Sequence, residues 1–192
     1  MSHAALFLDR DGTINHDPGY IRNPDDIILY PGVVEGIRQL KNKFRMKMIV
    51  ISNQSGIARG MMTHEDVRSI NNRINEILLD SGTSIDGFYY CPYHPDYSEK
   101  HLTTCRKPSP ELVFLAAKEH DIDLSKSYFV GDKISDVDCG INAGVKTIFL
   151  KNELNEQEII SLKKGIKTPN FVACNFSDVC DFIINDYTEA GS

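Results

Sequence analysis

Short apolar segments of strand length alternate with helical segments along this chain, and no other feature constrains its fold as strongly. The first such segment, residues 4–8, stops at a charged cluster, and the one at 48–51 stops at Ser52, Asn53 and Gln54. Between them, the apolar residues at 33, 34, 37 and 40 have the spacing of one helix face. Strands that alternate with helices form a parallel sheet covered by helices on both faces. We therefore expect an α/β fold with a doubly wound parallel sheet, whose ligands bind at the carboxyl ends of the strands.

Local signals place the individual elements. Strands are predicted over residues 4–8, 48–51, 87–91, 128–130, 146–150 and 171–173, and helices over 33–43, 63–78, 109–117, 137–143 and from 177 onward. Thr63 and Asp66 resemble a capping box at the start of the second helix, Ser109 and Pro110 suit the start of the third, and Gly144 ends the fourth. A long loop is expected from residue 92 to residue 108.

Length and charge limit the function classes. With 192 residues the chain fits one domain, which we expect over residues 1–188, with a frayed tail at 189–192. A net charge of −6 argues against nucleic acid as a ligand, because phosphate backbones are bound by basic surfaces. No apolar run approaches the roughly 20 residues that cross a bilayer, and the N-terminus lacks the basic region of a signal peptide. We expect a cytoplasmic monomer that acts on a small molecule and binds neither nucleic acid nor a membrane.

The cysteines agree with that compartment. There are five of them, an odd number, and they are scattered along the chain. We interpret them as reduced thiols and not as a disulfide framework. Cys139, Cys174 and Cys180 fall on predicted helix or strand faces, so we expect them to lie in the core.

Acidic residues follow two of the predicted strands. Asp9 and Asp11 come directly after the first strand, in a turn that Gly12 permits, and Asp132 and Asp136 follow the strand at 128–130. Two like charges about 4 Å apart repel by about 4 kcal/mol at an effective dielectric constant near 20. A set of oxygen ligands with this repulsion favours a hard divalent cation, and we expect Mg²⁺. For Asp136, a role in capping the following helix is an equally good interpretation.

A hydroxyl and an ammonium group are predicted to lie beside these acids. Ser52 ends the second strand, and Lys107 precedes a helix start. Together with a cation and loop amides, they could hold the three equatorial oxygens of a phosphoryl group in transfer. One carboxylate could then attack phosphorus and form an aspartyl-phosphate, while the second protonates the leaving oxygen and later activates water.

At this point the chain resembles a known family. Asp-Arg-Asp-Gly-Thr at residues 9–13, Ser52, Lys107 and Gly-Asp-Lys-Ile-Ser-Asp at 131–136 resemble the four ordered motifs of phosphatases of the haloacid dehalogenase (HAD) superfamily. Residues 19–20, 52–60, 89–92 and 105–108 are similar to D-glycero-D-manno-heptose 1,7-bisphosphate phosphatases and the related histidinol phosphatases. The resemblance implies a Rossmann-like sheet of the HAD type without a cap domain, in which loop insertions close the pocket.

The resemblance also implies roles for individual residues. Asp9 would be the nucleophile and Asp11 the general acid and base, while Ser52 and Lys107 would stabilise the phosphoryl group. Asp9, the backbone carbonyl of Asp11, and Asp132 would hold Mg²⁺. The positions where this family contacts its substrate are Asp17, Pro18, Gly19, Tyr20, Asn53, Gln54, Ser55, Arg106 and Lys133.

The substrate implied is D-glycero-D-manno-heptose 1,7-bisphosphate, whose 7-phosphate is removed on the way to nucleotide-activated heptose for lipopolysaccharide or another surface glycan. Histidinol phosphate is the alternative substrate, although the Arg106–Lys107 pair and the loop at residues 17–20 match the bisphosphate branch better. A protein that binds phosphate without catalysis is the alternative of a different class. It would require the loss of Asp9 or Asp11, and both are present.

The chain departs from this family in the loop after residue 91. Family members carry Cys-x-His and Cys-x-Cys as zinc ligands there; Cys91 and Cys105 match, but Tyr93 and Thr103 replace the other two. His94 and His101 could substitute for them at a spacing compatible with Zn²⁺. We expect that packing and hydrogen bonds hold this loop, and that Zn²⁺ does not.

Overall fold

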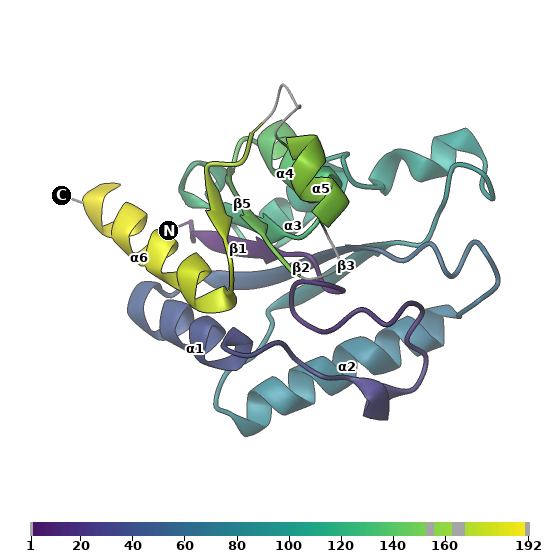
Figure 1. Cartoon of the computed structure of the whole chain (residues 1–192), viewed down its shortest axis with the longest axis horizontal. Helices are drawn as coiled ribbons and strands as arrows, with labels where there is room; N and C mark the ends of the chain where they lie inside the picture. Colours follow the sequence, from purple (N-terminus) through teal and green to yellow (C-terminus); the bar gives the residue numbers. More distant parts are fainter. Residues whose placement is uncertain (1, 153–155, 163–167, 191–192) are drawn as a thin grey trace.

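The predicted parallel sheet is present in the computed structural model, which describes residues 2–152, 156–162 and 168–190. Within these residues, six strands pair side by side in the order β3-β2-β1-β4-β5-β6, and all pairs are parallel (Figure 1). The strands are β1 (Ala5–Leu8), β2 (Lys47–Asn53), β3 (Gly87–Cys91), β4 (Tyr128–Gly131), β5 (Lys146–Leu150) and β6 (Phe171–Ala173). All six strands predicted from the sequence are confirmed.

Helices cover both faces of the sheet (Figure 1). The helices are α1 (Val33–Phe44), α2 (His64–Asp80), α3 (Glu111–Glu119), α4 (Ile134–Ala143), α5 (Glu156–Leu162) and α6 (Phe176–Ala190). Helices α1, α2 and α6 pack on one face, and α3, α4 and α5 lie on the other. In the described part of the chain, no helix combines the length and the apolar character needed to cross a membrane.

The central strand β1 is buried on both faces, and this explains why its sequence is a continuous apolar run. Leu6 and Leu8 point into the core beneath α1, α2 and α6, whereas Ala5 and Phe7 point into the core beneath α3 and α4. All four side chains are fully buried. Because a parallel sheet with helices on both faces has no solvated side, its strands do not alternate between apolar and polar residues.

The predicted helix starts are partly confirmed. At the start of α2, Thr63 Oγ1 accepts a hydrogen bond from the Asp66 amide at 3.1 Å, and Asp66 Oδ2 accepts one from the Thr63 amide at 2.7 Å. Helix α3 begins one residue later than predicted, with Pro110 and not Ser109 as its N-cap. The C-terminal helix extends to Ala190, so residues 189–190, which we expected in a tail, are helical, and 191–192 lie outside the described residues. Helix α5 was not predicted.

The loop after β3 contains the main correction to the sequence analysis. Cys91, at the end of β3, and Cys105, at the end of a 3₁₀ helix over Lys100–Cys105, form a disulfide with their Cα atoms 5.5 Å apart. The expectation that all five cysteines are reduced is therefore wrong, because the loop folds back and brings these two together. Cys139 and Cys180 are buried as expected, but Cys174 is exposed.

Candidate active site

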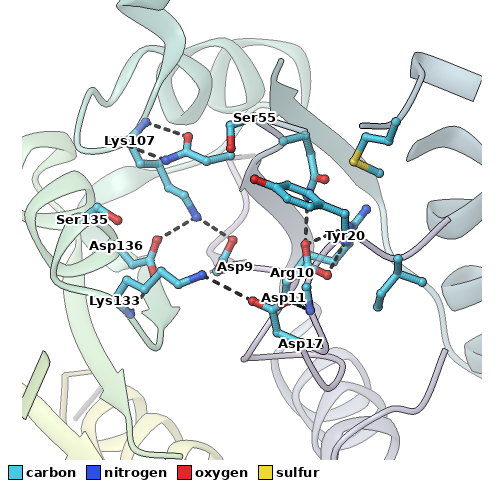
Figure 2. Close-up of a pocket in the computed structure, with 15 residues that line it drawn as sticks. Asp9, Arg10, Asp11, Asp17, Tyr20, Ser55, Lys107, Lys133, Ser135 and Asp136 are labelled. Atoms are coloured by element: carbon cyan, nitrogen blue, oxygen red, sulfur yellow. Dashed lines mark hydrogen bonds and ion pairs between the residues drawn. The ribbon is translucent and has the colours of Figure 1, made fainter. Parts of the chain in front are cut away.

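The predicted site residues meet where the strand order changes direction. From β1 the chain passes to β2 and β3 on one side of the sheet, and it returns to β4 on the other side of β1. Ligands of such sheets bind at this point, beyond the carboxyl ends of the strands. A cavity of about 350 Å³ opens there (Figure 2). Its lining includes Asp9, Asp11, Asp17, Gly19, Tyr20, Asn53, Gln54, Ser55, Lys107, Lys133 and Asp136.

Lys107 lies at the centre of the buried end of this cavity. Its Nζ is 2.6 Å from Asp9 Oδ1 and 2.7 Å from Asp136 Oδ1, and it donates to the Ile51 carbonyl at 2.8 Å (Figure 2). Burial alone would lower the pKa of Lys107, but the charges of Asp136 and Asp9 outweigh it and hold this pKa well above its usual value. The ammonium group is therefore permanently charged and fixed beside Asp9.

Asn53 holds the backbone of Lys107 in place. The Lys107 amide donates to Asn53 Oδ1 at 3.0 Å, and Asn53 Nδ2 lies 3.3 Å from the Lys107 carbonyl oxygen. This pair joins the end of β2 to a segment 54 residues later in the chain. Asn53 was predicted to contact substrate; the structure gives it a positioning role and also places it in the cavity wall.

Three buried carboxylates converge at the same end. Asp9, Asp132 and Asp136 each offer an oxygen, and these oxygens lie within 4.8 Å of one another. Burial, with the added charge of Asp9, raises the pKa of Asp132 to about 7. Burial also raises the pKa of Asp136 to about 6, although Lys107 opposes this shift. These raised pKa values show that the buried carboxylates repel one another when ionised. A divalent cation with oxygen ligands would remove this repulsion, so the residues fit Mg²⁺.

Two glycines make room for this cluster. Gly12 has φ +89°, in the left-handed region, and a Cβ atom there would collide with the carboxylate of Asp132. A Cβ atom at Gly131 would collide with the side chain of Asp136. The turn that the sequence analysis assigned to Gly12 is confirmed, and the close approach explains why no larger residue fits.

Asp136 takes part in the start of α4, but not as the N-cap that the sequence left open, and it also faces the other charged groups of the site. The N-cap of α4 is Lys133, and Asp136, three residues later, accepts a hydrogen bond from the Lys133 amide at 3.0 Å. Its other oxygen pairs with Lys107. The capping contact starts α4 three residues before its predicted start, and it points the second oxygen at the site.

Asp11 is held by nitrogen donors on both oxygens. Oδ1 accepts from Arg10 Nε at 3.1 Å and Asn15 Nδ2 at 3.0 Å, and Oδ2 accepts from Arg10 Nη2 at 2.7 Å and Gln54 Nε2 at 2.9 Å. Burial alone would raise the pKa of Asp11, but the charge and hydrogen bonds of Arg10, with those of Gln54 and Asn15, hold it below its usual range. Gln54 Nε2 is also 3.3 Å from Ser52 Oγ, so it links two predicted site residues.

Asp17, Tyr20 and Lys133 line the outer part of the cavity, and Arg106 lies close enough to Tyr20 for the two to interact electrostatically; we call these four residues the rim. Lys133 Nζ is 3.8 Å from Asp17 Oδ2 (Figure 2). Arg106 is half-buried and donates to the Tyr93 carbonyl, and it is not part of the cavity wall. Burial and the neighbouring charge of Arg59 lower the pKa of Arg106. Ser52, Asp132 and Pro18 are likewise not in the wall; the first two are buried at the ends of β2 and β4.

The four residues considered for zinc do not converge. Cys91 and Cys105 are bonded to each other, whereas the ring of His94 contacts Arg59 at 3.0 Å and Asp96 at 3.7 Å. The ring of His101 is 3.4 Å from Glu99, and its side chain is 71% exposed. Whether the protein uses Zn²⁺ stays a prediction.

Three site residues escaped the sequence analysis. Asn152 Nδ2 lies 3.2 Å from the Gly12 carbonyl and 3.1 Å from Asp132 Oδ2, so it ties the two acidic loops together. Its position directly after the predicted strand at 146–150 was the available signal. Arg10, which contacts Asp11, donates a hydrogen bond from Nη1 to Asn71 Oδ1 at 3.1 Å. No sequence pattern singles out Asn71.

Several known proteins that are similar to this chain in sequence and fold are phosphatases. A family model described as HAD-hydrolase-like matches residues 104–179. D-glycero-D-manno-heptose-1,7-bisphosphate 7-phosphatase of Chlorobaculum tepidum is 41% identical over 82% of this chain and 83% of its own length. D-glycero-beta-D-manno-heptose-1,7-bisphosphate 7-phosphatase of Helicobacter pylori (strain ATCC 700392 / 26695) is 36% identical over 95% of this chain and 98% of its own length. The crystal structure of D,D-heptose 1,7-bisphosphate phosphatase from B. bronchiseptica, complexed with magnesium and phosphate, superposes with a TM-score of 0.83 at 25% identity, covering 95% of this chain and 99% of that one. The chain therefore belongs to the heptose 1,7-bisphosphate phosphatases of the HAD superfamily.

Proposed function

We propose that this protein is a Mg²⁺-dependent phosphatase that removes the 7-phosphate of D-glycero-D-manno-heptose 1,7-bisphosphate by way of an aspartyl-phosphate on Asp9. The observation that carries the proposal is the buried contact of 2.6 Å between Asp9 and Lys107, inside a group of carboxylates at the closed end of the cavity. A carboxylate fixed beside a permanent cation can approach a phosphate dianion that it would otherwise repel.

The reaction proceeds in two steps. In the first, a carboxylate oxygen of Asp9 attacks phosphorus and the bond from phosphorus to the sugar oxygen breaks. Asp11, which is a carboxylate in the free protein because its pKa is low, first takes up a proton from solvent and then gives it to that sugar oxygen. In the second, a water molecule attacks the phosphorus of the aspartyl-phosphate, Asp11 accepts a proton from this water, and inorganic phosphate and the Asp9 carboxylate are released. Lys107, with the Ser52 hydroxyl, balances the charge on the phosphoryl oxygens during both steps.

The acidic cluster supplies the ligands for the metal. Asp9 and Asp132, with the backbone carbonyl of Asp11, would hold Mg²⁺, and the cation would neutralise charge on the phosphate. Both oxygens of Asp136 are engaged, Oδ1 by Lys107 and Oδ2 by the Lys133 amide, whereas Lys107 contacts Asp9 through Oδ1. Asp9 and Asp132 are therefore the principal carboxylate ligands. The magnesium and phosphate in the structure of the similar B. bronchiseptica phosphatase support Mg²⁺ as the metal.

The rim favours a substrate with a second phosphate. Arg59 and Arg106 lie close enough for the charge of one to lower the pKa of the other, and Lys133 is half-exposed in the cavity wall. Like charges gathered at an opening are relieved by an anion, and the forked guanidinium of Arg106 suits a phosphate. A bisphosphate would place one phosphate at Asp9 and the other here.

The cellular setting is part of the same proposal. We propose a cytoplasmic monomer that supplies heptose 1-phosphate for a surface glycan, because phosphorylated sugars and their activated derivatives are handled inside the cell. The acidic net charge of −6 supports a small-molecule substrate over nucleic acid.

Phosphate release across a substrate panel tests the proposal. With Mg²⁺, kcat/KM should be highest for heptose 1,7-bisphosphate and lower for histidinol phosphate and 4-nitrophenyl phosphate, and EDTA should abolish all three activities. A higher kcat/KM for histidinol phosphate would favour the histidinol-phosphatase alternative. Binding of the sugar bisphosphate without any release of phosphate would mean a non-catalytic binding protein.

A further inference from the structure

The largest fully buried side chain in the described part of the molecule is a charged one. Arg10 is 1% exposed, although it follows Asp9 directly at the mouth of the sheet. Burying a charge is costly unless the group is paired and hydrogen-bonded. The two-step reaction above makes no use of Arg10, so the contacts that hold it in the interior need a separate explanation.

Arg10 connects Asp11 to a helix far away in the sequence. Its Nε and Nη2 donate to the two oxygens of Asp11, at 3.1 Å and 2.7 Å, in a side-on fork. Its remaining terminal nitrogen, Nη1, donates to Asn71 Oδ1 at 3.1 Å, across 61 residues. Asn71 is 7% exposed on the face of α2 that otherwise buries apolar residues such as Ile70 and Ile74.

The geometry around Asp11 is more than an anchor for the helix. Arg10 grips both carboxylate oxygens from one side, and Asn15 and Gln54 each add one donor, so the plane of the carboxylate is fixed. Arg10 contacts α2 through its hydrogen bond to Asn71, and an apolar residue at position 71 could be buried without any partner. Anchoring the helix therefore does not require the fork on Asp11. The fork and its amide partner specify the direction of Asp11.

We propose that Asn71 and Arg10 are positioning residues that set the orientation in which Asp11 transfers its proton to the leaving oxygen. This inference rests on the proposed function, because it takes Asp11 as the proton donor. A general acid must come within hydrogen-bonding distance, about 2.6–3.2 Å, of the atom that it protonates. Asn71 acts at a distance: it orients Arg10, and Arg10 orients the carboxylate.

The dependence on leaving group separates this role from a merely structural one. A sugar alkoxide needs a proton to leave, whereas 4-nitrophenolate is a stable anion and needs little help. Because kcat/KM reports the steps up to formation of the aspartyl-phosphate, the ratio of kcat/KM for heptose bisphosphate to that for 4-nitrophenyl phosphate measures how well Asp11 donates its proton. Loss of a general acid costs about 100-fold or more, so Asp11→Asn sets the scale for this ratio.

The experiment measures this ratio in the Mg²⁺-loaded enzyme and four variants. Asn71→Leu should lower the ratio about 5-fold, as expected for the loss of one hydrogen bond. Arg10→Lys keeps the charge but not the fork, and it should lower the ratio further. Asn75→Leu is the matched control: it lies one turn later on α2 and its side chain accepts a hydrogen bond from the Ile85 amide at 2.8 Å, remote from Asp11. This variant should keep the wild-type ratio.

Each outcome decides between the alternatives. An unchanged ratio in folded Asn71→Leu and Arg10→Lys, with a lowered ratio in Asp11→Asn, would mean that the pair only anchors α2. A raised ratio would mean that Arg10 holds Asp11 away from the substrate, which also overturns the inference. If Asn71→Leu does not fold, Arg10→Lys decides alone. A normal ratio in Asp11→Asn would instead remove the proton donor from the proposed function.

Discussion

The two ends of the substrate cavity are built in different ways. At the closed end, the inner cluster consists of Asp9, Lys107, Asp132 and Asp136, and none of these residues is more than 5% exposed. At the rim, by contrast, Tyr20 is 43% exposed, and the side chain of Lys133 is 46% exposed. Contacts in the inner cluster are as short as 2.6 Å, whereas the ion pair between Lys133 and Asp17 spans 3.8 Å.

This difference separates chemistry from substrate choice. Buried charges depend on one another, because removing one leaves its partner without solvent or a counter-ion. The charges at the rim keep their water, so each can change with little effect on the fold. We therefore expect changes in the inner cluster to alter turnover, and to lower stability where they leave a buried charge without its counter-ion. Changes at the rim should alter selectivity alone.

Replacing the nucleophile should have the largest effect on activity. Asp9→Asn keeps the shape and one oxygen for Lys107, but it cannot form the aspartyl-phosphate, so kcat should fall by at least about 1,000-fold. Because one carboxylate of a repelling group is neutralised, the melting temperature without metal should not fall. Phosphate-release assays and thermal melts measure both. Retention of more than a tenth of wild-type kcat would contradict covalent catalysis.

Removing the other partner of the same ion pair should give the opposite result for stability. Lys107→Ala should lower kcat/KM by about 100- to 1,000-fold for every phosphate ester, because a group that stabilises the transition state is lost. It should also cost about 3 kcal/mol of unfolding free energy, since Asp9 and Asp136 remain buried without their counter-ion. Activity and denaturant unfolding should be measured on the same preparation. Full stability in this variant would break the contrast between the inner cluster and the rim.

A rim residue should affect one substrate and not another. Arg106→Ala should lower kcat/KM for heptose bisphosphate by roughly 10- to 150-fold, the value of one charge-assisted contact, and should spare 4-nitrophenyl phosphate. The melting temperature should stay near that of the wild type. Equal losses for both substrates would place Arg106 with the reacting groups and would remove the main local support for a second phosphate.

Metal should stabilise the protein, and more so at higher pH. The pKa of Asp132 in the metal-free protein is about 7, above the ordinary value near 4 for an exposed aspartate. Between these values the folded state binds more protons than the unfolded state, so the unfolding free energy falls as the pH rises toward 7. Mg²⁺ at 100-fold above its Kd should add about 2.7 kcal/mol, which corresponds to roughly 5–10 °C for a chain of this size.

Thermal melts with Mg²⁺ and with EDTA at pH 5 and pH 8 measure this difference. The increase in melting temperature caused by Mg²⁺ should be larger at pH 8, where the carboxylates are ionised and repel one another. In Asp132→Asn the difference between the two pH values should shrink. Superimposable curves with Mg²⁺ and EDTA at pH 8 would argue against an acidic metal site.

The sequence was sufficient for the parts of the molecule that depend on neighbouring residues. The strand at 146–150 and the capping box of Thr63 and Asp66 were predicted because burial pattern and local hydrogen bonds leave a mark within a few residues. The same holds for the acids after β1 and β4, since parallel strands place their carboxyl ends together. Features that are determined by residues close together in the sequence can therefore be predicted from it.

Contacts between distant segments were not predictable in this way. Asn71 lies among apolar helix residues and would be taken for a solvated position, because its partner Arg10 is 61 residues away. The disulfide was missed because an odd number of cysteines suggested free thiols, whereas the pairing of Cys91 with Cys105 depends on how the loop folds back. Helix α5 lies in a polar stretch without strong periodicity.

The backbone of the nucleophile belongs to the sheet itself. The Asp9 amide donates to the Val130 carbonyl at 2.9 Å, which extends the pairing of β1 with β4 by one residue beyond the strand. Exchange of the Asp9 amide hydrogen for deuterium therefore requires the two central strands to separate. We expect this to happen when the whole domain unfolds. The amide of the exposed Gly19, next to the rim, is hydrogen-bonded to the half-buried Asp17 side chain and can exchange through local opening. The slowest amides of this enzyme should thus include that of its most reactive residue.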